Sequence, residues 1–152
     1  MTTKILQTFM LTLIVSCQPK KVDYNPFHKL DLNQKCSVYF IRSEGDWGNF
    51  EKTNEDFVLT DNAALKKLKD NWWLSLTDKR MACGFGYLVF ITQNDKLVEK
   101  IQINEPCGYA ITTGGWYDFN EGYYDFIEVS KISKLNRPTA DSVQNAFRQI
   151  KE

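Results

Sequence analysis

The sequence predicts an α+β domain in which an antiparallel sheet of four to six strands carries two or three helices packed on one face. Two runs rich in β-branched and aromatic residues, 84–92 and 97–104, flank a short polar turn, which is the pattern of a β-hairpin. Apolar residues recur at helical spacing after Asp61 and again near the C-terminus. The 152 residues are 43% hydrophobic, which suits one compact domain.

The central hairpin, 84–104, has a register that its own pattern specifies. Centring the turn on Asp95 pairs Tyr87 with Ile103 and Val89 with Ile101, and it faces Ile91 with Glu99. The odd-numbered positions then form a nearly continuous apolar face, which we expect to be the core. Its apolar members are Phe85, Tyr87, Val89, Ile91, Leu97, Ile101 and Ile103.

The same register brings two cysteines, Cys83 and Cys107, opposite one another. Facing Cα atoms in an antiparallel pair lie about 4.5–5.5 Å apart, a distance that suits a disulfide. We therefore predict a Cys83–Cys107 disulfide, which in the chain-entropy model contributes on the order of 3 kcal/mol to stability for a loop of this length. Cys36 is left over, as either a small buried residue or a competing thiol.

One amphipathic helix and two strands precede the hairpin in the sequence. Strands are expected at 36–42 and 56–60 from their β-branched and aromatic content. The helix is expected to begin with a cap at Thr60 or Asp61 and to end near Trp73, where Trp73 itself is exposed. Its buried face is predicted by three residues at helical spacing, Leu65, Leu68 and Trp72.

Four further elements are expected after the hairpin. Strands at 109–113 and 116–119 continue the antiparallel meander around a two-glycine turn. The stretch 123–134 fits helical and strand patterns about equally poorly, and we interpret it as a helix. A C-terminal helix follows a spacing of Asp141 and Gln144 that resembles a capping box. Its apolar face is predicted at Val143, Ala146, Phe147 and Ile150.

The first residues have the pattern of a removable export signal. Lys4 precedes an apolar run from Ile5 to Val15, and no acidic residue occurs before Asp23. Eleven residues of helix span about 16 Å, well short of the ~30 Å of a hydrocarbon core. A permanent membrane-spanning helix is therefore not expected here.

The end of this run, Leu13-Ile14-Val15-Ser16-Cys17, resembles the lipobox of bacterial lipoproteins. The resemblance implies removal of residues 1–16, a diacylglycerol on the thiol of Cys17, and usually acylation of the new amino terminus. Because each buried CH₂ contributes about 0.8 kcal/mol, two or three acyl chains would hold the protein durably on a bilayer. The residue after Cys17 is not the Asp that signals inner-membrane retention in this family, so outer-membrane anchoring facing the periplasm is expected. The remaining chain divides into a tether, 17–35, and one globular domain, 36–152.

The sequence contains few groups suited to catalysis or metal binding. The single histidine, His28, lies in the expected tether, so the domain has no imidazole for a Ser-His-Asp or Cys-His site or for a two-histidine metal site. We predict no catalytic residue, metal ligand or cofactor. The 19 basic and 19 acidic side chains cancel, which supplies no overall field for binding nucleic acid.

Aromatic and acidic residues alternate in the segment 112–128. Aromatic rings beside carboxylates can bind sugar rings or cationic ligands, although the same residues can also be core aromatics and solvated acids. We expect a non-enzymatic module that binds an envelope protein, for example of an inhibitor or immunity type. The alternative is a glycan-binding module or a weak carboxylate-based glycan hydrolase that uses this segment. The candidate ligand-binding residues are Trp116, Tyr117, Asp118, Glu121, Tyr124 and Asp125.

Overall fold

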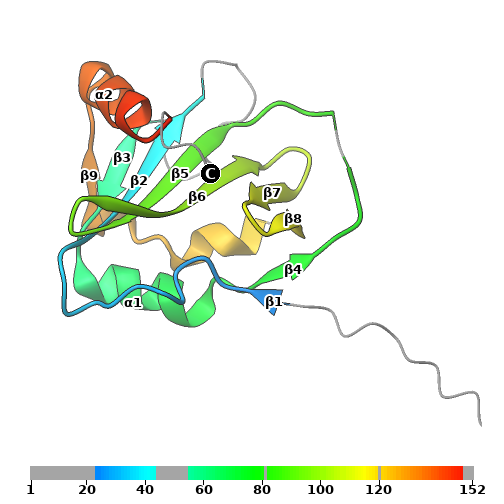
Figure 1. Cartoon of the computed structure of the whole chain (residues 1–152), viewed down its shortest axis with the longest axis horizontal. Coiled ribbons are helices and arrows are strands. Elements are labelled where there is room, and N and C mark those ends of the chain that lie inside the picture. The colour runs from blue at the N-terminus through cyan, green and yellow to red at the C-terminus, as the bar shows by residue number, and fades with distance from the viewer. Residues whose placement is uncertain (1–22, 44–54, 81, 120, 149–152) are drawn as a thin grey trace, which may run out of the picture.

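The described residues form one antiparallel sheet with an α-helix on each side (Figure 1). The computed structural model describes residues 23–43, 55–80, 82–119 and 121–148. The nine strands lie in the order β1-β4-β8-β7-β6-β5-β2-β3-β9. They are β1 (Asp23–Tyr24), β2 (Cys36–Arg42), β3 (Phe57–Leu59), β4 (Leu74–Leu76), β5 (Tyr87–Gln93), β6 (Lys96–Asn104), β7 (Tyr109–Thr112), β8 (Gly115–Asp118) and β9 (Ile132–Lys134). The helices are α1 (Asn62–Asn71) and α2 (Arg137–Arg148), with two 3₁₀ helices, η1 (Glu121–Phe126) and η2 (Val129–Lys131).

The predicted fold class was wrong in strand number and in helix placement. The described sheet has nine strands, so the fold is β-rich, and its two α-helices lie on opposite faces instead of together on one. Helix α1 packs its buried leucines into the main core on what we call the inner face. Helix α2 packs Ala140 against Ile41 and Phe90 on the other side, which we call the outer face. The strands β2 and β5 are therefore covered on both faces, which their continuous apolar sequences allow.

The register of the central hairpin is confirmed for most of its length. Tyr87 pairs with Ile103, Val89 with Ile101 and Ile91 with Glu99. A bulge after Ile91 then shifts the pairing, so that Asn94 and Asp95 form the turn, both with positive φ. The shift moves one predicted core residue, Leu97, to the apolar cluster beneath α2 on the outer face.

The helix predicted after Asp61 is confirmed. Helix α1 begins at Asn62, and the Asp61 carboxylate accepts a hydrogen bond from the Ala64 N–H at 3.0 Å. This hydrogen bond lowers the pKa of Asp61 below its usual value. The predicted apolar side chains Leu65, Leu68 and Trp72 are fully buried, whereas Trp73 is 46% exposed.

Helix α2 exists as predicted, but its start and part of its face differ. It begins at Arg137, because the Asn136 side chain accepts from the Thr139 N–H at 2.9 Å and so acts as the cap in place of Asp141. Val143 and Phe147 pack on the outer face, as expected, together with Ala140. Ala146 is exposed, and Ile150 lies outside the described residues.

The helix interpreted at 123–134 is not present. This stretch contains the end of η1, then η2, and then β9, which pairs with β3. Tyr124 and Ile127 are buried in the main core, which gives the segment tertiary contacts without a regular period. Short 3₁₀ turns of this kind carry no amphipathic pattern that a sequence could reveal.

Part of the expected tether belongs to the folded structure. Strand β1 pairs with β4, and Phe27 and Leu30 are buried in the main core. The Asn25 side chain holds the turn, since it accepts from the Phe27 N–H at 2.8 Å and donates to the Lys69 carbonyl at 2.7 Å. The folded unit thus starts by Asp23 and not at Cys36, while Cys17 lies outside the described residues. In the described part of the chain, no helix is long and apolar enough to cross a membrane.

Candidate binding site on the outer face of the sheet

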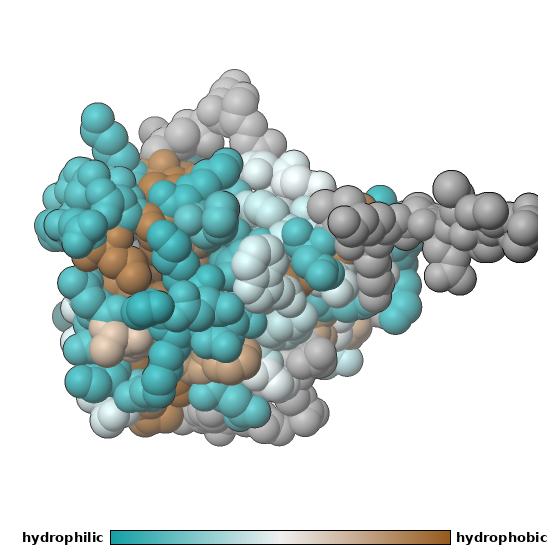
Figure 2. Space-filling view, turned by 90° about the horizontal axis from the view of Figure 1, so that it is seen from below, coloured by the Kyte–Doolittle hydropathy of each residue, from teal (hydrophilic) through white to brown (hydrophobic). Residues whose placement is uncertain are grey.

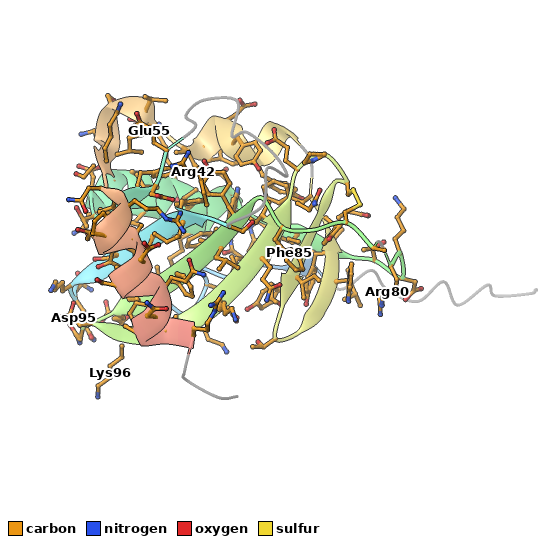
Figure 3. All side chains as sticks on the ribbon, turned by 90° about the horizontal axis from the view of Figure 1, so that it is seen from above. Arg42, Glu55, Arg80, Phe85, Asp95 and Lys96 are labelled. Atoms are coloured by element: carbon orange, nitrogen blue, oxygen red, sulfur yellow. A yellow bond between two sulfur atoms is a disulfide. The ribbon has the colours of Figure 1, made fainter. Side chains whose placement is uncertain are left out.

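Helix α2 covers only part of the outer face. Beyond it, a lateral row of residues continues across the neighbouring strands from Leu88 through Gln102 and Ile111 to Trp116. All four side chains are partly exposed, and Lys100, paired with Phe90, lies on the same face. Figure 3 looks onto this face, with α2 over one half of the sheet and the labelled Phe85 over the other. We call Arg80, Leu88, Lys100, Ile111 and Trp116 the Trp116 patch.

The Tyr109 ring packs beside Trp116 in a tilted arrangement, the Phe85 ring packs edge-on against Tyr109, and the Arg80 guanidinium lies over the Trp116 ring. The ring of Tyr109 lies 4.9 Å from that of Trp116, and the ring of Phe85 lies 6.0 Å from Tyr109. The Arg80 guanidinium carbon sits 5.2 Å from the Trp116 ring centroid, within cation–π range. The Arg80 side chain also donates to the carbonyls of Thr77 and Lys79, each at 3.2 Å. Trp116 is thus fixed in place while part of its surface stays accessible.

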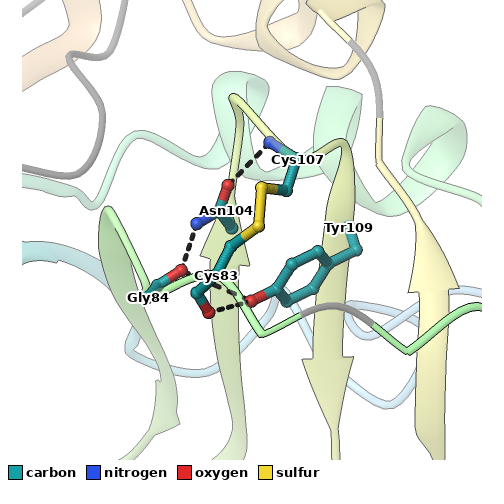
Figure 4. The surroundings of a disulfide bond; sticks show 5 residues. All are labelled: Cys83, Gly84, Asn104, Cys107 and Tyr109. Atoms are coloured by element: carbon teal, nitrogen blue, oxygen red, sulfur yellow. Dashed lines mark hydrogen bonds between the residues drawn. A yellow bond between two sulfur atoms is a disulfide. The ribbon is translucent and has the colours of Figure 1, made fainter.

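A disulfide holds the loop that leads over this face (Figure 4). Cys83 and Cys107 are bonded, as predicted, although their Cα atoms are 6.6 Å apart and they lie in the loops beside the hairpin, not in its paired strands. The Tyr109 hydroxyl donates to the Cys83 carbonyl at 2.5 Å, and burial raises the pKa of this phenol. The Asn104 side chain accepts from the Cys107 N–H at 2.7 Å and donates to the Gly84 carbonyl. Cys36 is buried and unpaired.

The candidate ligand-binding residues of the segment 112–128 do not share one surface in the structure. Trp116 and Asp118 lie on the outer face, where Asp118 is 3.6 Å from the Lys79 ammonium. Tyr117 points to the inner face and stacks on Tyr24 at 5.2 Å, so it shares no surface with Trp116. Tyr124 is buried in the core, and Asp125 is exposed on η1. The side chain of Glu121 lies outside the described part of the structure.

Several residues of the Trp116 patch were missed by the sequence reasoning. Leu88 and Lys100 are even-numbered positions of the hairpin, and only the odd-numbered face was assigned a role. Arg80 lies in a loop that has no periodic pattern. The signal that could have found this face was present, because Leu88 and Phe90 make the even positions of β5 apolar as well.

A buried carboxylate, that of Glu99, lies on the inner face of the sheet. Glu99 pairs with Ile91, as the predicted register requires. Glu99 is 7% exposed, and it accepts a hydrogen bond from the Tyr24 hydroxyl. Burial, and next this hydrogen bond, raise the pKa of Tyr24. The Thr113 hydroxyl lies 3.4 Å from the same carboxylate. Within the described residues, no three His, Cys, Asp or Glu side chains gather as metal ligands.

Buried phenols predict an alkaline loss of stability. Burial raises the pKa of Tyr87 above its usual 10.0, so above pH 10 the unfolded chain releases a proton that the folded chain keeps. The free energy of unfolding should therefore fall as pH rises past 10, and Tyr87→Phe should make the fall shallower by up to about 1.4 kcal/mol per pH unit. Urea unfolding across this range measures the slope. A slope that Tyr87→Phe leaves unchanged would contradict the assignment.

Comparisons with known proteins do not assign the chain to a class. No protein-family model matches it, and neither a curated protein nor a solved structure is similar enough to be matched with it.

Proposed function

We propose that the chain is a lipoprotein of a bacterial cell envelope whose domain binds a protein partner, without catalysis, through the Trp116 patch. The observation that carries the proposal is a fixed, partly exposed Trp116 with the Arg80 guanidinium over its ring, beside partly exposed aliphatic side chains. Tryptophan and arginine on a rigid surface are the residue types that dominate binding energy in protein interfaces.

The charge of the patch indicates the kind of partner. Arg80 and Lys100 form no ion pair with any described carboxylate, whereas most other described cations near the sheet do. An acidic surface of the partner would supply the missing counter-charge and would accelerate association. The partner would thus present carboxylates around an apolar centre that receives Trp116.

The cellular location of the protein is part of the same proposal. The lipobox-like sequence supports acyl chains on Cys17, and the residues after it support the outer membrane with the domain facing the periplasm. The disulfide supports an oxidising compartment, since such bonds persist in exported proteins and are rare in the cytosol. Mass spectrometry of the natural protein tests this part, because an intact Met1 or an unmodified Cys17 thiol would contradict it.

Site-specific photo-cross-linking in intact cells tests the binding surface. A photoreactive residue at Gln102, inside the outer-face row, should give a discrete protein adduct. The same residue at Lys66, on the exposed side of α1, should not. Trp116→Ala in the Gln102 background should reduce the adduct by about tenfold or more, since a central aromatic of this kind contributes about 2 kcal/mol or more.

The controls separate binding from folding and from the glycan alternative. Val129→Ala removes an exposed apolar side chain elsewhere and should leave the adduct unchanged. An adduct that survives Trp116→Ala would refute the patch. If no protein adduct forms and peptidoglycan fragments instead change the fluorescence of the wild type but not of Trp116→Phe, the ligand is a glycan.

A further inference from the structure

We infer that the β1–β4 edge of the domain rests on the phospholipid bilayer to which the chain is anchored, with Trp73 and Leu76 in the headgroup region. The inference rests on the proposed lipid anchor at Cys17. It adds an orientation: one edge of the sheet faces the membrane, and the opposite edge, at β9, faces away from it. The contact is made by the domain itself, in addition to the acyl chains.

The length of chain between anchor and domain sets the orientation. Six residue steps separate Cys17 from Asp23, the first residue of β1, and a chain spans at most about 3.6 Å per residue. Asp23 therefore stays within about 20 Å of the anchored thioether. A domain of this length is on the order of 30 Å or more across, so the β1 end is held near the bilayer. Figure 1 shows β1 beside β4 at one side of the molecule, and β9 at the other.

Two of the three exposed large hydrophobic side chains among the described residues flank this edge. Trp73 is 46% exposed immediately before β4, and Leu76 is 39% exposed at its end. The third, Val129, is 51% exposed next to β9. Figure 2, which views the molecule from the side of α1, shows hydrophobic residues scattered between hydrophilic ones, mostly toward the end away from β1 and β4, so the proposed contact depends on Trp73 and Leu76. Moving exposed apolar side chains out of water lowers the free energy of the system, and tryptophan is enriched at the membrane interface.

Trp73 is held outward by its surroundings. Its indole N–H donates to the Asp70 carbonyl at 3.1 Å, and its own carbonyl accepts from the Tyr123 hydroxyl at 2.7 Å. The His28 ring lies 6.4 Å from the indole. Because Leu76 neighbours Tyr117, it lies on the inner side of β4, away from Trp116. The bilayer contact and the Trp116 patch therefore use different faces of the sheet.

The test anchors the mature chain, residues 17–152, chemically. The Cys17 thiol is coupled to a maleimide lipid in phosphatidylcholine vesicles, which makes the test independent of natural lipidation. The coupling is selective, because Cys83 and Cys107 are disulfide-bonded and Cys36 is buried with a raised thiol pKa. Quenching of tryptophan fluorescence by lipids brominated near the headgroup then reports which indole reaches the bilayer.

We expect clear differences between variants in the quenching of tryptophan fluorescence. The wild type should be quenched, Trp73→Phe should lose roughly half of this quenching or more, and Leu76→Ser should weaken it. Val129→Ser, at the opposite edge, should behave like the wild type. Quenching that Trp73→Phe leaves intact, or that only Trp116→Phe removes, would overturn the inference. An unmodified Cys17 in natural protein, with these vesicle results intact, would instead refute the lipid anchor alone.

Discussion

Substitution of Trp72 by alanine is expected to lower the free energy of unfolding by about 3–5 kcal/mol, which approaches the whole stability of an ordinary domain. The side chain is fully buried and contacts three segments that are distant from it in sequence. Its indole N–H donates to the Tyr123 carbonyl at 2.6 Å, which ties α1 to η1. Its ring contacts lie 5.0 to 6.3 Å away, at Phe27, Phe40, Phe119 and Tyr123.

Urea unfolding of the Trp72→Ala and Trp73→Ala variants measures this effect against a matched neighbour. Trp73 is exposed, so Trp73→Ala should stay within about 0.5 kcal/mol of the wild type. If Trp72→Ala fails to fold, Trp72→Phe keeps most ring contacts, leaves the Tyr123 carbonyl without its donor, and should lose about 1–3 kcal/mol. Equal losses of stability at positions 72 and 73 would contradict the burial of Trp72 and the exposure of Trp73.

The contrast between the two tryptophans shows where sequence reasoning succeeds. Trp73 is exposed as predicted, but helix α1 ends at Asn71, so the direction in which the chain leaves the helix sets this exposure. Trp72 shares a helical period with Leu65 and Leu68, so its burial followed from spacing. The hairpin register could be predicted for a similar reason. Two long strands with a period of two and a two-residue turn leave few alternative pairings.

The number of strands could not be predicted because the missing ones are too short to show a pattern. Strand β1 has two residues, and β4 and β9 have three each. Each is stabilised by the neighbour that pairs with it, and those neighbours are distant in sequence. The position of α2 was missed for a related reason. Its apolar face was recognised, but the sequence did not specify which side of β5 it covers, since both sides are apolar.

The candidate site shows the limit most clearly. Trp116 and Tyr117 are adjacent in the sequence and were grouped as candidate ligand-binding residues, yet alternation along β8 places them on opposite faces. Conversely, Arg80 and Trp116 are far apart in sequence and meet because the loop after β4 passes over β8. Nearness in sequence is a poor guide to shared surface on a strand, where every second residue changes side.

Loss of the Cys83–Cys107 disulfide is expected to lower the free energy of unfolding by about 3 kcal/mol, because the link closes a separation of 24 residues. Urea unfolding of the wild type with and without reductant measures the loss, and Cys83→Ala combined with Cys107→Ala should reproduce it. Cys36→Ala should respond to reductant as the wild type does, because Cys36 is not bonded. If reductant lowers the free energy of unfolding of the double variant by the same amount as that of the wild type, the effect does not come from this disulfide.

The same substitution should weaken the Trp116 patch more than global stability alone would explain. The bond fixes the loop whose Cys83 carbonyl accepts from Tyr109, and the Tyr109 ring supports Trp116. Without the bond, the loop that carries Arg80 has more conformations to lose when a partner binds, so affinity falls even while the domain stays folded. Partner cross-linking through Gln102 should therefore drop in the double variant at temperatures where its circular dichroism is still native. Undiminished cross-linking under those conditions would show that the loop does not position the patch.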